Sequence, residues 1–302
     1  MDDCIIIGAG PAGLTTAIYL ARYHLDIRLF DSGSSRAAMI PCTHNHAGYP
    51  DGIAGKDLLA LMQAQAEKYG ARREQVKVTG LTRDGDDFIV RTDHGTHHAR
   101  TVLLATGVVN HRPAYLLPEV HDPALARGLL RYCPVCDGYE VTDRRVAIIG
   151  TGDHGMREAL FLRGFTRDVT LVSPEAEHAL DPACAQALDD AGVVRIEGPC
   201  GDYAIEGDQL AFDTARGRMA FDSVYPALGS RIRSRLAVEA GARASDEGCL
   251  EVDDHQRTSV PGLFAAGDVV KGLDQISHAM GEAGVAATAI RNLLAERRPL
   301  RR

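Results

Sequence analysis

The chain has 302 residues, of which 45% are hydrophobic and 25% are charged, and its formal net charge is -8. This length is enough for about two domains with cores of their own, and the composition is that of an ordinary globular protein rather than a disordered or fibrous one. The negative charge argues against nucleic acid as a partner, because binding to a phosphate backbone requires an excess of positive charge.

The N-terminal segment CIIIGAGPAGLTTAIYLA is apolar enough to resemble a secretion signal. It follows Asp2 and Asp3 rather than a basic region, however, and it contains several glycines. No other stretch approaches the ~18 apolar residues of a membrane span. The seven cysteines are an odd number and five of them stand alone, which does not suit a secreted disulfide framework. We therefore expect a cytoplasmic protein with no membrane partner.

The first 31 residues have the pattern of a nucleotide-binding βαβ unit. A strand over 4–7 leads into GAGPAG at 8–13, a helix continues to Tyr23, and a strand over 26–30 ends at Asp31. In this fingerprint the glycines allow a tight turn and close approach to a pyrophosphate, and the acid accepts from a ribose hydroxyl. The predicted cofactor-binding residues here are Gly8, Gly10, Ala12, Gly13 and Asp31.

The same pattern returns later in the chain. A strand over 145–149 precedes the turn that contains Gly150, Gly152 and Gly155, and a helix over 156–165 and a strand over 169–172 follow. Two such motifs in the same context predict an α/β protein with two Rossmann-like nucleotide-binding folds. Further elements are expected as a helix over 56–69, a hairpin over 88–104, a strand-like region reaching Tyr225, and a last helix over 281–296.

Two cysteines, Cys133 and Cys136, stand two residues apart in RYCPVCDGYE and are followed by Asp137. The pair has three interpretations: a zinc site, a structural bridge, or a redox pair. Zinc commonly needs about four ligands, and no second cysteine pair follows. A redox role suits the spacing, because a small disulfide of this kind can open and close when one thiolate has a lowered pKa. Asp137 could move a proton for such a pair or could simply cap a helix or turn.

Several motifs in order resemble the low-molecular-weight thioredoxin reductases, which are two-domain flavoprotein disulfide oxidoreductases. The resemblance covers nearly the whole chain. Its residues, besides the first glycine turn and the CPVCDG segment, are Ala105, Thr106, Gly107, Gly267, Asp268, and Asn45 within HNHAGYPDGIAG. It implies an FAD-binding domain formed by residues 1–112 and 243–302, with an NAD(P)-binding-like domain, 113–242, inserted between them and carrying the cysteine pair.

The resemblance also implies an activity. FAD would be the cofactor, Cys136 would exchange electrons with the flavin, Cys133 would attack a partner disulfide, and Asp137 would move a proton to or from the leaving thiol. The expected partner is a small protein disulfide of the thioredoxin type or a small-molecule dithiol. A homodimer is expected on the same basis.

The chain departs from this family where a reductase should bind the 2'-phosphate of NADPH. The family has a basic cluster after the second strand of the second fold, whereas this chain has Ser173-Pro174-Glu175-Ala176-Glu177. Glu175 could accept from a ribose 2'-hydroxyl or could be a solvated loop acid. NADPH, NADH and the lack of a tight nicotinamide site all remain open, and Gly150, Gly152 and Gly155 mark the possible nicotinamide site.

Histidines near the expected flavin site form a second departure. The family's Arg-Gln-Ala near the flavin ring appears as Ser277-His278-Ala279, which would place His278 beside the flavin, where it could stabilise the reduced flavin, or could be a packing histidine. His44 and His46 flank Asn45 and either belong to this flavin-edge loop or bind a metal; we predict no metal site. Cys42 lies close to the same loop.

Three functions therefore remain open. The first is a thioredoxin-reductase-like enzyme supplied by a nicotinamide. The second keeps the dithiol/disulfide chemistry but passes electrons from a dithiol to oxygen, or takes them from another carrier, and the missing basic cluster favours it. The third is a flavin-binding redox sensor with negligible turnover.

Overall fold

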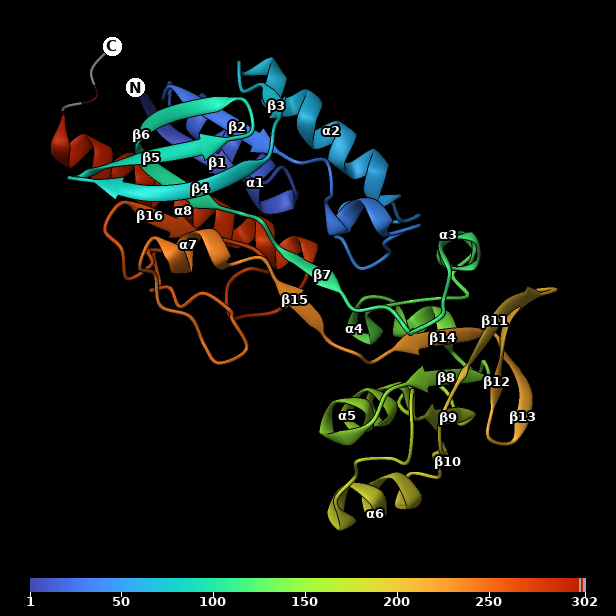
Figure 1. The fold of residues 1–302 in the computed structure, drawn as a ribbon. Coiled ribbons are helices and arrows are strands. Elements are labelled where there is room, and N and C mark those ends of the chain that lie inside the picture. The colour runs from blue at the N-terminus through green and yellow to red at the C-terminus, as the bar shows by residue number, and fades with distance from the viewer. Residues whose placement is uncertain (299, 301–302) are drawn as a thin grey trace.

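The computed structural model describes residues 1–298 and 300, which form two units, each built on a sheet with a parallel core (Figure 1). The first unit contains a seven-stranded sheet with the order β3-β2-β1-β6-β5-β4, and β16 pairs with β6. Its strands are β1 (Asp2–Ile7), β2 (Ile27–Asp31), β3 (Arg73–Gln75), β4 (Val78–Asp84), β5 (Asp87–Thr92), β6 (Gly95–Leu104) and β16 (Leu263–Ala265). The predicted hairpin is thus part of a three-stranded antiparallel run.

Helices cover this sheet because each presents an apolar stripe to it. They are α1 (Pro11–Arg22), α2 (Gly55–Lys68) and α8 (Ile276–Arg297), together with the short 3-10 helix η1 (Arg36–Met39). The three α-helices share one core cluster with alternate residues of β1, such as Cys4 and Ile6, while Ile5 and Ile7 belong to the cluster on the opposite face. This alternation follows from the two-residue period of a strand.

The last helix begins earlier than the predicted residue 281, at Ile276. Ala279 and Ala283 are both buried in the core that α8 shares with α1, so packing continues the helix through Gly281. Nothing lies within 4 Å of a Cβ built on that glycine. The early start makes Gln275 the residue that precedes the helix.

The second unit has a parallel sheet with the order β10-β9-β8-β14 and a separate antiparallel sheet with the order β11-β12-β13. Its strands are β8 (Val146–Ile149), β9 (Val169–Val172), β10 (Val194–Ile196), β11 (Gly201–Glu206), β12 (Gln209–Thr214), β13 (Gly217–Phe221) and β14 (Ser223–Pro226). Its helices are α3 (Pro118–Ala126), α4 (Pro134–Asp137), the 3-10 helix η2 (Gly138–Val141), α5 (Gly152–Leu162) and α6 (Pro182–Asp190). The all-buried strands β8, β9 and β14 are typical of a parallel sheet.

Two antiparallel strands, β7 (Val108–Asn110) and β15 (Ser230–Ile232), carry the chain between the units (Figure 1). After β15 comes α7 (Arg235–Glu239), whose Leu236 and Ala237 pack in the core of the first unit together with Ala242. The chain therefore returns to the first unit ahead of residue 243, because this short apolar helix packs against β4 of that unit. None of the helices within the described residues is long and apolar enough to cross a membrane.

Candidate active site

A cavity of about 860 Å³ is lined by residues of both units. It brings together most of the residues predicted from the sequence, although they come from distant parts of the chain. The predicted site residues that line it are Gly8, Gly10, Ala12, Asp31, Asn45, Ala105, Thr106, Gly107, Gly267, Asp268, Ala279, Cys133, Cys136 and Asp137. The two nucleotide-type motifs differ here, because Gly150, Gly152 and Gly155 are not among the lining residues.

The first glycine turn closes between β1 and α1 in a way that only glycine permits. A Cβ on Gly13 would lie 1.8 Å from the carbonyl oxygen of Gly8, and one on Gly8, whose φ is +109°, would lie 2.3 Å from the carbonyl oxygen of Ala105. Gly13 therefore allows α1 to pack closely against the end of β1, although it does not itself line the cavity. No side chain within the described residues caps α1, which leaves the N–H groups of its first turn to bind an anion.

Asp31 ends β2 beside this turn. Its carboxylate accepts from the backbone N–H groups of Ala9, at 3.2 Å, and Gly33, at 3.0 Å, and lies 3.2 Å from the guanidinium of Arg73. The side chain is largely buried, so its position is fixed before any ligand arrives. This placement agrees with an acid that accepts from a ribose hydroxyl.

A cluster of charged side chains lines the cavity near the start of α8. Arg36 of η1 lies 3.0 Å from a carboxylate oxygen of Asp268 and 2.9 Å from one of Asp274. Burial raises the pKa of Asp274, and the charge of Asp268 adds to this effect while Arg36 opposes it. The sequence reasoning did not single out Arg36, whose position beside Asp268 depends on contacts more than 200 residues apart in sequence.

Cys133 and Cys136 form a disulfide, with 5.2 Å between their Cα atoms. Pro134 begins α4, and the Sγ of Cys133 accepts from the backbone N–H of Cys136 at 3.1 Å. Because the two sulfurs are joined to each other and line the cavity, the zinc interpretation of this pair does not apply. The remaining interpretations are a structural bridge and a redox pair.

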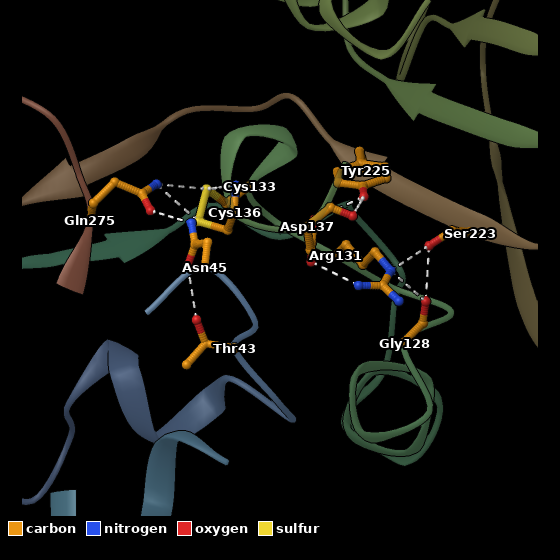
Figure 2. A network of polar contacts seen from close by, with 10 residues as sticks. All are labelled: Thr43, Asn45, Gly128, Arg131, Cys133, Cys136, Asp137, Ser223, Tyr225 and Gln275. Atoms are coloured by element: carbon orange, nitrogen blue, oxygen red, sulfur yellow. Dashed lines mark hydrogen bonds and ion pairs between the residues drawn. A yellow bond between two sulfur atoms is a disulfide. The ribbon is translucent and has the colours of Figure 1, made fainter. Parts of the chain in front are cut away.

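Gln275 is another residue that the sequence reasoning missed. Its Nε2 donates to the Sγ of Cys136 at 3.1 Å and to the Sγ of Cys133 at 3.4 Å (Figure 2). Its Oε1 accepts from Asn45 Nδ2 at 2.8 Å, and Asn45 Oδ1 in turn accepts from Thr43 Oγ1 at 2.9 Å. An earlier predicted start for the last helix would have pointed to this residue, since it directly precedes that helix.

Asp137 is held by two donors on the other side of the pair (Figure 2). One carboxylate oxygen lies 3.0 Å from Arg131 Nη1 and the other accepts from the hydroxyl of Tyr225 at 2.8 Å. Burial raises the pKa of Asp137, and the charge of Arg131 and the bond from Tyr225 oppose this rise. Burial, with the nearby Asp137 charge, also raises the pKa of Tyr225, so its hydroxyl stays protonated and donates.

This geometry bears on the two interpretations of Asp137. The residue that caps α4 is Cys133, and Asp137 makes no capping bond with its side chain where η2 begins. A buried carboxyl with a raised pKa, adjacent in sequence to a disulfide, has the properties of a group that exchanges protons. The side chain of Asp137 therefore does not act as a cap in this structure.

The histidines near the cavity have separate surroundings. His278 lies 3.0 Å from Glu282 through its Nε2 and is not among the residues that line the cavity, whereas His44 is. His46 lies 2.9 Å from the hydroxyl of Ser277 through Nδ1 and stacks on Tyr49. Within the described residues no group of three or more His, Cys, Asp or Glu side chains is placed to hold a metal ion.

The second glycine turn contacts a later segment of its own chain, which we call the covering segment. The covering segment, residues 176–181, connects β9 to α6, and its Ala179 N–H donates to Thr151 Oγ1 at 2.7 Å. A Cβ on Gly152 would lie 3.4 Å from the carbonyl oxygen of Ala179. Glu175 and Glu177 are exposed to solvent beside this segment. The turn keeps its geometry, with Gly152 partly exposed and Asp153 and His154 exposed to solvent.

Two dinucleotide-type folds with a disulfide at the cavity between them define a disulfide oxidoreductase. The chain belongs to the pyridine nucleotide-disulphide oxidoreductase family, whose model matches residues 2–283. Within it, the chain is a thioredoxin-reductase-like disulfide oxidoreductase, and the family implies FAD as the cofactor.

Named relatives agree with this membership. The chain is similar to the thioredoxin reductase of Mycolicibacterium smegmatis, with 34% identity over 89% of each chain. It is also similar to the solved thioredoxin reductase of Streptococcus pyogenes MGAS5005, with a TM-score of 0.87, 28% identity and coverage of 98% of this chain and 99% of that one. The Lactococcus lactis thioredoxin reductase in its FR conformation has 28% identity and covers 98% and 100%, but the TM-score is 0.63. Both structures have 28% identity and cover 98% of this chain, so the lower TM-score of the Lactococcus lactis structure indicates that its overall arrangement differs more from that of this chain.

Proposed function

We propose that this enzyme exchanges electrons between FAD and a thiol partner through Cys133 and Cys136. The observation that carries the proposal is that the disulfide and the first glycine turn line one cavity although they belong to different units. A structural bridge would have no reason to lie at a cofactor cavity. Bound FAD would supply two-electron redox chemistry next to the pair.

The residues of the cavity fit this cofactor. The uncapped first turn of α1, with Gly8, Gly10, Ala12 and Gly13, suits its pyrophosphate, and Asp31 suits its ribose. The other residues that would hold it are Asn45, Ala105, Thr106, Gly107, Gly267, Asp268 and Ala279. His278 was expected beside the flavin or as a packing histidine; its side chain is exposed, lies 3.0 Å from Glu282 and does not line the cavity, which supports neither role.

The thiol reaction follows from the disulfide. A partner thiolate attacks the sulfur of Cys133, the S–S bond breaks, and Cys136 leaves as a thiolate. The second partner thiol then attacks the mixed disulfide, so the partner leaves oxidised and the cysteine pair holds two more electrons. In the opposite direction the reduced pair reduces a partner disulfide. Asp137, whose pKa burial raises, exchanges the proton of the thiol that is released or consumed.

The nicotinamide donor is the open part of this function. The family and the relatives named thioredoxin reductase favour a reductase that delivers electrons to a small thioredoxin-like protein. The covering segment at the second turn, with the acids Glu175 and Glu177 beside it, favours the second candidate. In that candidate the enzyme oxidises a small dithiol with oxygen, or takes its electrons from another carrier, and has no tight site for NADPH or NADH.

Other parts of the prediction stay proposals. A cytoplasmic location accords with the five free cysteines, and a homodimer is proposed on the family resemblance alone. A non-catalytic redox sensor stays as the third candidate. The sensor candidate predicts that Cys133→Ser leaves every cellular phenotype of the protein intact, whereas a variant that no longer binds FAD loses the phenotype.

The deciding experiment is anaerobic reduction of the purified yellow protein. NADPH, NADH and a dithiol are mixed with it separately while the main flavin absorbance band is followed. Rapid bleaching by a nicotinamide supports the reductase, and bleaching by the dithiol alone supports the second candidate. In either case Cys136→Ser is expected to slow bleaching by the dithiol at least ~1000-fold, since the pathway through the pair is lost; a variant that bleaches normally would contradict the proposed function.

A further inference from the structure

The two sulfurs of the pair have different hydrogen-bond donors. Cys133 Sγ accepts from the backbone N–H of Cys136, within its own unit, at 3.1 Å. Cys136 Sγ accepts from the side chain of Gln275, which belongs to the first unit, also at 3.1 Å. The second contact of Gln275, with Cys133, is longer at 3.4 Å. The Sγ of Cys133 therefore has a backbone N–H as its nearer donor, whereas the Sγ of Cys136 has a side-chain amide from the first unit.

The amide of Gln275 is fixed in orientation. Asn45 donates to its Oε1 at 2.8 Å, and Thr43 donates to Asn45 at 2.9 Å (Figure 2). Because a carbonyl oxygen accepts and an amide nitrogen donates, the bond from Asn45 leaves the Nε2 of Gln275 facing the sulfurs. The hydrogen bonds from Thr43 to Asn45 and from Asn45 to Gln275 therefore hold the amide in the orientation in which its N–H groups face the disulfide. The amide does not have to rotate to donate to a sulfur.

We propose that Gln275 is a catalytic residue of the redox centre, whose N–H stabilises the thiolate of Cys136 whenever the S–S bond is open. When a partner thiolate bonds to Cys133, the S–S bond breaks and its electron pair leaves on Cys136 Sγ, within reach of Gln275. In the reverse reaction the same thiolate attacks Cys133, expels the partner thiolate and restores the disulfide. Hydrogen bonds to a charged sulfur are stronger than those to a neutral one, so Gln275 favours the open state over the closed one.

The inference rests on the proposed function only in that the pair must open. Other ionisable groups line the same cavity as the pair, and they remain in place when Gln275 is replaced. They include Asp31, Arg36, His44, Lys77, Arg127, Arg131, Asp137, Glu140, Arg231, Arg233, Arg235, Asp268 and Asp274. A comparison of variants at position 275 therefore isolates the contribution of the amide.

The test measures the pH dependence of alkylation at each cysteine in the full FAD-loaded chain. In a Cys133→Ser background, Cys136 is treated with iodoacetamide over a range of pH and its labelled peptide is quantified by mass spectrometry. Gln275→Met keeps the length of the side chain and removes the donor. We expect the midpoint of Cys136 alkylation to rise by about one pH unit, the loss of about one hydrogen bond to a charged group. Gln275→Glu should raise it further, because a carboxylate repels the thiolate.

Two controls locate the effect. In a Cys136→Ser background, Gln275→Met should move the midpoint of Cys133 by less than about half a unit, because its main donor is the backbone. Gln63→Met, in α2 and away from the cavity lining, removes an amide that donates to Glu67 and should leave both midpoints unchanged. If Gln275→Met fails to fold, Asn45→Leu releases the amide and should give a smaller rise at Cys136.

The outcomes separate the two claims. An unchanged Cys136 midpoint in a folded Gln275→Met protein overturns the inference, even if dithiol turnover through the pair is intact. An equal rise at both cysteines overturns it as well, because that result means a general change at the site. Loss of dependence on Cys136 in the anaerobic experiment would instead contradict the proposed function and leave the alkylation result as it stands.

Discussion

The two glycine turns of this protein have the same sequence fingerprint and different surroundings. Gly8, Gly10 and Ala12 line a large cavity, whereas the turn containing Gly150 does not line it and its Thr151 accepts a hydrogen bond from Ala179 of the covering segment, residues 176–181. In both turns the last glycine lets the helix approach the strand: a Cβ on Gly13 would lie 1.8 Å from Gly8 O, and one on Gly155 would lie 2.9 Å from Gly150 C. The fingerprint therefore specifies how strand and helix meet, and it does not specify whether a ligand can reach them.

The largest effect is expected from Gly13→Ala in the open turn. The added methyl would collide with backbone, which cannot move without opening the turn, so we expect destabilisation by about 3 kcal/mol or more and loss of bound flavin. Gly10→Ala is the control, because its Cβ would meet only Ser35 Oγ at 3.4 Å; it should fold and lose only flavin affinity. Thermal unfolding and flavin content check both, and a Gly13→Ala protein with normal flavin content would contradict the role of the open turn.

The acids that follow the two turns give the next comparison. Asp31→Ala removes the acceptor of two backbone N–H groups and a partner of Arg73, and we expect FAD affinity to fall roughly 10- to 100-fold. Glu175→Ala, at the corresponding place in the second unit, is exposed and should change FAD affinity less than about twofold. Titration of the apoprotein with FAD measures both. Equal losses in the two variants would mean that the acids act through the overall fold.

The second unit contributes Asp137, the proposed proton-exchanging group, to the cavity. We expect Asp137→Asn to lower the rate of dithiol reaction about 100-fold, the usual contribution of a general acid or base, and to remove the limb of the pH profile that reports this carboxyl. Single-turnover reduction at several pH values checks the rate. A pH profile that Asp137→Asn leaves unchanged would show that the proton moves elsewhere.

Stability gives an independent check on Asp137. Burial raises its pKa, so the native protein binds this proton more tightly than the unfolded chain does. Its contribution to stability is therefore full below the unfolded pKa, about 3.9, and is lost as the pH rises through the folded value. Asparagine has no proton to lose, so the free energy of unfolding of Asp137→Asn relative to the natural protein should increase with pH over that window. Urea unfolding at a series of pH values measures this, and a difference that falls with pH would contradict the direction of the shift.

The smallest effect is expected at the covered turn. Thr151→Val removes the acceptor for the N–H of Ala179, and the loss of about one neutral hydrogen bond should speed exchange of that amide roughly 3- to 10-fold. Thr214→Val, which removes a turn bond to Gly217 in the antiparallel sheet, should leave Ala179 unchanged. If Thr151→Val does not change this exchange, the segment is held over the turn by other contacts.

Much of the fold could be predicted because its signals are local. Strands and glycines in the order of both βαβ units fixed the two nucleotide-type folds, and the strand over 169–172 has the predicted bounds. The CxxC spacing indicated a disulfide, which the structure confirms. These features depend on residues a few positions apart, where side-chain period and backbone conformation act directly.

The errors lie where packing decided. The last helix extends through Gly281 because Ala279 and Ala283 are buried against α1, and this early start placed Gln275, rather than His278, at the cavity. The chain also returns to the first unit before residue 243 because Leu236 and Ala237 fill its core. Neither result has a signal within its own segment.

By itself the sequence determined two strand-turn-helix units and a cysteine pair between them. It also determined the acids Asp31 and Glu175, which follow the second strand of each unit. Each of these features depends only on the spacing of residues along the chain. The tertiary structure decided which turn lines the large cavity, since that depends on how distant segments of the chain come together around it. It also decided which residue faces the sulfurs, since Gln275 and Cys136 are 139 residues apart in sequence and meet only when the two units close on one cavity.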